Sequence, residues 1–122
     1  MPESRPRGNG NRRAVGRRAE DQAAEFLRGL GFTIVTRNYT VRGGELDLVA
    51  VDGDELVFIE VRQRRGAVGA PEESLGPKKA GRLRVAARAY LTEIGEPERA
   101  FRFDVVAIDE AGLRHHRGAF GE

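Results

Sequence analysis

Residues 44–62 read Gly-Glu-Leu-Asp-Leu-Val-Ala-Val-Asp-Gly-Asp-Glu-Leu-Val-Phe-Ile-Glu-Val-Arg, and this stretch decides the fold. Two apolar runs, 46–51 and 56–62, are short and rich in β-branched residues, which predicts two strands. The polar residues 52–55 between them contain an Asp-Gly pair, which is typical of a β-hairpin turn. The second run is apolar on both faces, as expected of a central strand.

Each of these two strands carries one carboxylate where a core needs an apolar side chain. Asp47 stands between two leucines, and Glu60 stands between an isoleucine and a valine. A four-residue turn pairs Val51 with Leu56, and the same antiparallel register then places Asp47 directly opposite Glu60. The Cβ atoms of such a pair lie about 4.5–5.5 Å apart. Two like charges at that separation favour a cation between them, and hard oxygen ligands suit Mg²⁺ or Mn²⁺.

Further charged residues are expected beside this pair. Arg62 and Glu45 each lie two residues from one of the carboxylates and therefore share its face of the sheet. Glu20 lies at the edge of the apolar stripe of a predicted helix, from where it can face the sheet. Two strand carboxylates, one helix carboxylate and one cation are thus predicted to converge on one face. That arrangement suits phosphodiester hydrolysis by metal-activated water.

The rest of the chain predicts an α/β domain with a single mixed β-sheet flanked by helices. The hairpin is preceded by a helix over 14–30 and a strand over 32–36, and followed by a helix over 77–94 and strands over 101–108 and 113–117. Because a helix joins strands 56–62 and 101–108, these two are expected to be parallel, with a right-handed crossover. Residues 1–13 contain almost nothing to bury and are predicted as a disordered basic tail. Residues 14–122 then form the one domain.

Composition limits the classes of protein that the chain can belong to. The 122 residues suffice for one domain with a modest core. Cysteine is absent, which excludes a disulfide framework and a thiolate metal site and fits a reducing cytoplasm. No apolar run approaches the ~20 residues that span a bilayer, so no membrane partner is expected.

The net charge of +2 hides an uneven distribution of basic residues. All but two of the 21 basic residues are arginines, the better phosphate-binding side chain. They gather in the N-terminal segment, after Glu60 and along the second helix, and such clusters predict salt-sensitive binding to a polyanion. The predicted nucleic-acid contacts are Arg17, Arg18, Arg64, Arg65, Lys78, Lys79 and Arg82.

The order of several short motifs resembles a known family. These motifs are Gly16-x-x-Ala19-Glu20, Arg37-Asn38-Tyr39, residues 44–50, residues 58–62 with Arg64, Pro77-x-Lys79 and residues 102–106. Over residues 14–108 they resemble the YraN-like family of uncharacterised bacterial proteins. The spacing Asp-x(12)-Glu-x-basic also resembles the PD-(D/E)xK signature of restriction-endonuclease-like nucleases.

This resemblance implies an αβββαβ nuclease core related to that of archaeal Holliday-junction resolvases. It implies Glu20, Asp47 and Glu60 as metal ligands and position 62 as the catalytic cation. The sequence departs from the family at that position, where Arg62 replaces the usual lysine. Because arginine keeps its proton, Arg62 can stabilise charge but cannot act as a base. Catalysis would then depend on metal-activated water or on Lys79, or be weakened.

Three functions remain open on the sequence alone. The preferred one is a Mg²⁺- or Mn²⁺-dependent endonuclease acting on branched or structured DNA; RNA stays open as a substrate. The second is a catalytically weak or inactive nucleic-acid-binding protein of the same fold, and the third is a protein-interaction adaptor. Junction-cutting enzymes of this fold work as dimers, so the resemblance also raises a homodimer, although no stretch of the sequence marks a dimer surface.

The acidic residues also have structural interpretations. Asp47 and Glu60 could form ion pairs inside the sheet with Arg62, Arg37 or Arg102, and Glu20 could be solvated. Glu45 is expected to serve the Gly-Gly turn or to pair with an arginine. Asp104, in the apolar strand 101–108, is predicted to be a structural partner of an arginine.

Overall fold

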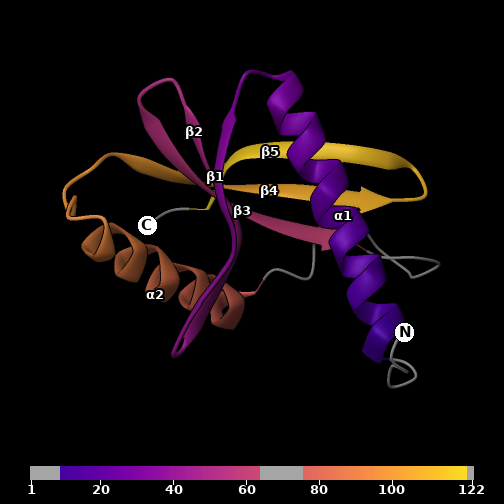
Figure 1. Cartoon of the computed structure of the whole chain (residues 1–122), viewed down its shortest axis with the longest axis horizontal. Coiled ribbons are helices and arrows are strands. Elements are labelled where there is room, and N and C mark those ends of the chain that lie inside the picture. The colour runs from indigo at the N-terminus through magenta and orange to yellow at the C-terminus, as the bar shows by residue number, and fades with distance from the viewer. Residues whose placement is uncertain (1–8, 64–75, 121–122) are drawn as a thin grey trace, which may run out of the picture.

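The computed structural model describes residues 9–63 and 76–120, and these form one five-stranded sheet with two helices (Figure 1). The elements are α1 (Asn9–Gly29), β1 (Thr33–Val41), β2 (Gly44–Asp52), β3 (Glu55–Gln63), α2 (Pro77–Glu93), β4 (Phe101–Asp109) and β5 (Gly112–Phe120). The strand order is β1-β2-β3-β4-β5, with β3 and β4 parallel and the other neighbours antiparallel. The predicted α/β class, single mixed sheet and parallel pair are confirmed.

The hairpin of β2 and β3 has the predicted register. Val51 pairs with Leu56, and the pairing continues to Leu48 opposite Ile59. The turn itself is shorter than predicted, because Asp52 and Glu55 already pair and leave only residues 53 and 54 between the strands. Gly53 has a positive φ of 65°, which this tight turn requires and which glycine adopts without strain.

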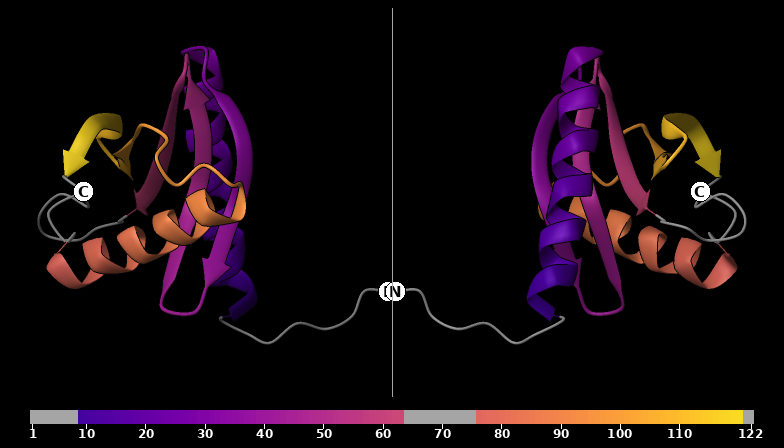
Figure 2. Two further views of the ribbon diagram at one scale, coloured as in Figure 1. Left: turned by 90° about the vertical axis from the view of Figure 1, so that its left-hand side faces the viewer. Right: turned by 90° about the vertical axis from the view of Figure 1, so that its right-hand side faces the viewer.

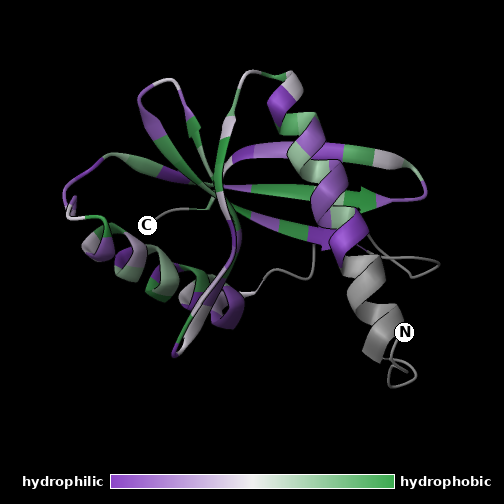
Figure 3. Ribbon diagram, viewed as in Figure 1, coloured by the Kyte–Doolittle hydropathy of each residue, from purple (hydrophilic) through white to green (hydrophobic). Residues whose placement is uncertain are grey.

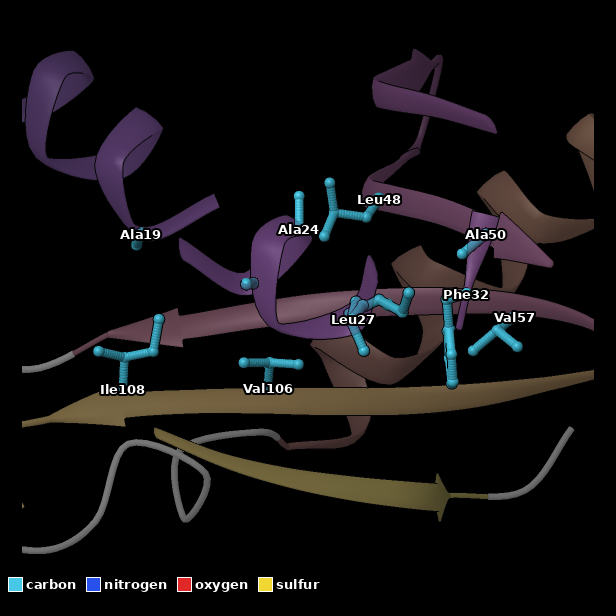
Figure 4. Packing of buried hydrophobic residues seen from close by; sticks show 11 residues of the cluster. Ala19, Ala24, Leu27, Phe32, Leu48, Ala50, Val57, Val106 and Ile108 are labelled. Atoms are coloured by element: carbon cyan, nitrogen blue, oxygen red, sulfur yellow. The ribbon is translucent and has the colours of Figure 1, made fainter. Parts of the chain in front are cut away.

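The two helices cover opposite faces of the sheet, which the two side views show (Figure 2). Ala23, Ala24 and Leu27 of α1 pack on Leu48 and Val106 in one apolar cluster (Figure 4). A second cluster joins α2 to the other face, with Leu83, Ala86, Tyr90, Phe58 and Phe103 among its buried members. The hydrophobic residues, green in Figure 3, lie along the central strands. Each face of the central strands is therefore buried, as their continuous apolar runs predicted.

Helix α1 and strands β1 and β5 are longer than the sequence pattern predicted, and β5 covers Gly112–Phe120 where residues 113–117 were expected. Helix α1 begins at Asn9 and not at residue 14, so part of the predicted disordered tail is helical; the rest of it, residues 1–8, lies outside the described residues. Arg12 and Arg13 favour a helix in this added segment, although Asn9, Gly10 and Asn11 do not. Strand β1 continues to Val41, past residue 36 where the predicted strand ended, and includes Asn38 with its φ of 54°.

Gly44, at the start of β2, lies directly against α2. A Cβ atom at this position would come 2.3 Å from the carbonyl oxygen of Arg82 and 2.8 Å from the amide nitrogen of Ala86. Only glycine fits such a contact between two main chains. The first residues of β2 are consequently fixed against the middle of α2.

No helix within residues 9–63 and 76–120 is both long and apolar enough to cross a membrane.

Candidate active site between beta2 and beta3

Strands β2 and β3 separate beyond the pair Leu48 and Ile59, and we call the opening the fork. On one side, residues 44–46 of β2 pair with β1. On the other side, residues 60–63 of β3 pair with β4. Asp47 and Glu60 are the first residues past the last shared pair, so both carboxylates lie at the start of the fork.

At the start of the fork, the side chain of Asp47 makes a hydrogen bond from β2 to the main chain of β3. Its Oδ2 accepts a hydrogen bond of 2.8 Å from the amide of Val61 on the separating strand. Burial raises the pKa of Asp47, and the adjacent Glu60 carboxylate raises it further, against the opposing effects of the Val61 amide and of Lys79. The register places Asp47 and Glu60 directly past the last shared pair, so the two carboxylates are neighbours, as predicted.

Glu60 is buried with its two oxygens in different situations. Its side chain is only 3% exposed. Oε2 lies 3.2 Å from Nη1 of Arg62 and 3.5 Å from Nζ of Lys79. Oε1 is buried and accepts no hydrogen bond from the described part of the chain. A buried carboxylate oxygen without a donor is costly, so this atom marks a place where a cation would be stabilised.

Glu20 approaches the fork from α1. Its side chain is 14% exposed, and Oε1 lies 3.5 Å from Nη2 of Arg37 on β1. Burial and the charge of Asp47 raise the pKa of Glu20, while hydrogen bonds from Asn38 and Arg37 oppose the increase. Glu20 is therefore close enough to interact with Asp47 and is not simply solvated.

Asn38 is a site residue that sequence reasoning did not assign. The register of β1 with β2 pairs residue 37 with 48 and residue 39 with 46, so Asn38 lies across from Asp47. It is the one non-glycine residue with positive φ in the described part of the chain. Strained backbone of this kind persists where surrounding contacts require it. The polar Arg37-Asn38 pair inside a strand pattern was the available signal, because asparagine tolerates this conformation.

Lys79 reaches the fork from α2 on the opposite face. Its Nζ lies 3.4 Å from Oε2 of Glu45 and 3.5 Å from Oε2 of Glu60. Glu45 thus pairs with a lysine, where an arginine or the turn had been expected. Lys79, which was not among the groups predicted to share one face, enters from α2, whereas Glu20 enters from α1 on the other face of the sheet. Glu20 interacts with Asp47, and Lys79 interacts with both Asp47 and Glu60.

The predicted nucleic-acid contacts divide into three groups. Lys78 and Arg82 are exposed on α2 beside Lys79, whereas Arg17 and Arg18 are exposed on α1. The structure therefore places basic side chains on both helices that flank the fork. Arg64 and Arg65 lie outside the described residues.

The donor set fits a hard divalent cation with two protein ligands. Within the described residues, no three histidine, cysteine, aspartate or glutamate side chains form a group that could hold a metal ion. Asp47 and Glu60, however, offer adjacent carboxylates, and no residue that the structure describes donates to Oε1 of Glu60. Mg²⁺ is commonly bound through one or two carboxylates together with water and phosphate oxygens. Glu20 as a third ligand stays a prediction.

Asp104 shows the structural alternative, as predicted. It is fully buried on β4, and Nε of Arg102 donates to its Oδ1 at 2.9 Å. Arg102 also contacts Glu55 and Asp52. This network joins the start of β4 to the ends of β2 and β3 at their turn, and it engages Arg102 away from Asp47 and Glu60.

Comparison with known proteins gives one consistent result. The model of the family described as Uncharacterised protein family UPF0102 matches residues 19–108. A UPF0102 protein of Anaeromyxobacter dehalogenans is 46% identical over 119 residues, covering 93% of this chain and 89% of the relative. UPF0102 proteins of Acidothermus cellulolyticus and Pelotomaculum thermopropionicum are 46% and 45% identical over 89% of this chain, and cover 95% and 97% of their own lengths.

Proposed function

This chain belongs to the uncharacterised protein family UPF0102, as its resemblance to the YraN-like family predicted, and we propose that it is a metal-dependent endonuclease. Its reaction would be hydrolysis of phosphodiester bonds in branched or structured DNA. The observation that carries the proposal is the fork, where two adjacent carboxylates lie beside two cations and one buried carboxylate oxygen receives no hydrogen bond from residues 9–63 and 76–120. A polar group of that cost is rarely kept without a ligand.

Asp47 and Glu60 are the residues that would hold Mg²⁺ or Mn²⁺, with Glu20 as the nearest further carboxylate. A bound divalent cation supplies Lewis-acid chemistry, polarising the phosphoryl group and lowering the pKa of a water. The chain itself positions the ligands. The Val61 amide fixes Asp47, and Asn38 with Arg37 fixes Glu20.

Arg62 and Lys79 would stabilise the negative charge that develops on the phosphate in the transition state. Both contact the same oxygen of Glu60 and are about a quarter exposed, so a phosphate can reach them from solvent. Arg62 cannot accept a proton. Because Arg62 stands where the family usually has a lysine, the role proposed for position 62 is to stabilise charge and not to transfer a proton.

The exposed basic residues on both helices support a nucleic-acid substrate. Lys78 and Arg82 extend the positive charge of Lys79 along α2. Arg17 and Arg18 add exposed positive charge on α1. Phosphate contacts of this kind position a strand without reading its sequence. We propose DNA as the polyanion, with binding that weakens as salt rises.

The test is a cleavage assay with Mg²⁺ or Mn²⁺ on linear, flapped and four-way DNA, combined with titration of Mn²⁺. Wild-type protein is expected to cut a branched substrate and to bind Mn²⁺. Asp47→Ala is expected to lose both, because it removes one of the two adjacent carboxylates. Asp54→Ala, an exposed acidic residue in the β2–β3 turn, serves as the matched control and should change neither. Cleavage of none of these substrates would contradict the enzyme proposal.

A second candidate function is DNA binding without catalysis. It is favoured by the ion pairs of Glu60 with Arg62 and Lys79, which already neutralise one oxygen of the site. Under this alternative, DNA binding is independent of metal, and Asp47→Ala leaves the affinity unchanged or raises it by removing repulsion. Loss of metal-free DNA binding in Asp47→Ala would argue against it.

A further inference from the structure

A pocket of about 230 Å³ lies between α2 and the start of β4, away from the fork. Arg84 and Arg88 of α2 provide its charged wall, one helical turn apart. Phe101 and Phe103 of β4, with Leu91 and Pro97, provide its apolar wall. A cavity that combines guanidinium groups with phenyl rings suits a ligand that is both planar and anionic.

The two phenylalanines of this pocket differ in availability. Phe103 is buried and stacks on Phe120, with ring centroids 4.6 Å apart. Phe101 is half-buried and makes edge contacts with Phe58 and Phe103. Phe101 is therefore the ring on which a ligand can pack.

We propose that this pocket binds one unpaired base of a DNA strand whose phosphates contact Arg84 and Arg88. The volume is below the ~300–1,000 Å³ of ordinary small-molecule pockets and suits a single ring system. Aromatic side chains bind unpaired bases by stacking, whatever the base, and arginine adds contacts to both base and phosphate.

A basic surface connects the fork to this pocket across α2. The helix carries five basic residues, Lys78, Lys79, Arg82, Arg84 and Arg88, and its one acidic residue, Glu93, comes last. Arg88 follows Lys79 by nine residues, which is half a turn around the helix and about 13 Å along its axis. The basic side chains thus extend from one flank of α2, over its exposed face, to the other. The small residues Gly81 and Ala89 leave room between them.

The sheet gives the same separation independently. Phe101 pairs with Leu56 at the start of β3, and Glu60 lies four residues farther along that strand. Four residues of a strand span about 13 Å. At the 3.4 Å rise of duplex DNA this corresponds to about four nucleotides, and to fewer in an extended single strand. With the duplex at the fork, an unpaired base about four nucleotides away would reach the pocket, so the pocket selects a duplex with a single-stranded arm. This placement of the arm rests on the proposed function of the fork.

The experiment measures binding by full-length protein in EDTA, so that it does not depend on cleavage. Fluorescence anisotropy compares a blunt duplex, the same duplex with a single-stranded tail, and a free deoxynucleotide monophosphate. A 2-aminopurine in the tail, about four nucleotides from the junction, reports stacking. Wild type should bind the tailed duplex more tightly than the blunt one and quench the probe, and bind the mononucleotide weakly.

Two substitutions address the two walls of the pocket. Phe101→Leu keeps an apolar side chain but removes stacking, and should lower affinity for the tailed duplex about tenfold, with little effect on the blunt duplex. Arg88→Gln changes an exposed residue and should reduce the same preference without affecting folding. The matched controls are Phe26→Leu and Arg28→Gln on α1, an exposed aromatic and an exposed arginine, which should bind as wild type does.

Several outcomes would overturn the pocket proposal. They are equal affinity for blunt and tailed duplex, equal loss on both in Phe101→Leu, an unchanged preference in Arg88→Gln, or a mononucleotide that binds as tightly as the tail. A thermal unfolding curve for Phe101→Leu separates loss of folding from loss of stacking. Cleavage by wild type without any effect of Phe101→Leu would refute the pocket alone. A tail preference in a protein that neither binds Mn²⁺ nor cleaves would refute the fork proposal alone.

Discussion

Asp104 and Glu60 are buried carboxylates on neighbouring parallel strands, and their surroundings differ. Arg102 donates to both oxygens of Asp104, at 2.9 and 3.2 Å. His115 Nε2 lies 2.8 Å from Oδ2, and the Gly118 amide donates to Oδ1 at 3.0 Å. Among the described residues, Glu60 contacts cations through Oε2 alone, and the carboxylate of Asp47 is its neighbour.

The comparison separates a structural carboxylate from a candidate site. Burial alone would raise the pKa of Asp104, but the donors from His115, Arg102 and Gly118 outweigh it and keep the pKa below its ordinary value. At Asp47, burial and Glu60 act in the same direction and raise the pKa. Burial thus acts on both Asp104 and Asp47, and they differ in how many hydrogen-bond donors surround the carboxylate.

The largest expected difference is in stability. Asp104→Asn should lower the free energy of unfolding by about 3 kcal/mol, because it leaves the half-buried guanidinium of Arg102 and the largely buried His115 facing a neutral amide. Glu60→Gln should cost about 1 kcal/mol or less, because solvent reaches Arg62 and Lys79. Urea unfolding of both variants measures the difference. Equal losses would remove the distinction between the two regions.

A smaller effect is expected at Asn38. Asn38→Ala should cost about 1–2 kcal/mol of stability, because alanine resists positive φ. Asn38→Gly accepts this backbone conformation and should remain near wild-type stability, yet it loses the hydrogen bond to Glu20.

Mn²⁺ titration of the glycine variant then tests whether Asn38 positions Glu20 for the site. Weaker Mn²⁺ binding at unchanged stability is the expected result. Wild-type affinity in Asn38→Gly would show that the contact with Glu20 contributes only to folding.

Removal of Lys79 should affect metal binding and catalysis in opposite directions. Lys79→Met leaves Glu60 with Arg62 as its remaining cation among the contacts of Oε2, so a metal ion meets less competition. We expect Mn²⁺ affinity to rise about fivefold, equivalent to about 1 kcal/mol, while cleavage slows. Lys78→Met, on the exposed neighbouring residue, is the matched control for loss of charge. A parallel fall in both quantities would contradict direct competition.

The two regions are also expected to differ in the sign of the dependence of stability on pH. The raised pKa of Asp47 means that the folded chain binds this proton more tightly, so its contribution to stability falls as pH rises above the ordinary value of about 3.9. The lowered pKa of Asp104 gives a contribution present above that value and lost as pH falls through the folded pKa. Relative to wild type, Asp47→Asn should gain stability with rising pH, whereas Asp104→Asn should lose it. Urea unfolding over a pH series measures both slopes, and slopes of the same sign would contradict the comparison.

Sequence reasoning found those parts of the fold that depend on local pattern. The turn at 52–55 and the alternation around it fixed the register of β2 and β3, and the crossover predicted that β3 and β4 are parallel. The identity of the candidate site residues followed from their apolar neighbours. The arginine partner of Asp104 was also predicted correctly.

The fork and the pocket were beyond a local pattern. Where β2 and β3 separate, each stays paired with its other neighbour, β1 or β4, and the pairing of β3 with β4 joins residues far apart in the sequence. The contact of Lys79 with Glu45 and Glu60 likewise depends on how α2 packs across the sheet. The wall of arginines and phenylalanines exists only where α2 meets β4.

The close contact of Gly44 with α2 allows the geometry of the site to be changed without replacing a charged residue. Since the two main chains touch, no side chain can rearrange to absorb an added methyl group, and the strand or the helix must move. The spacing between Asp47 on β2 and Lys79 on α2 is thereby set by backbone contact. An alanine at position 44 would widen the site without changing any of its charged side chains. The effect of that substitution would therefore measure how much the site depends on geometry alone.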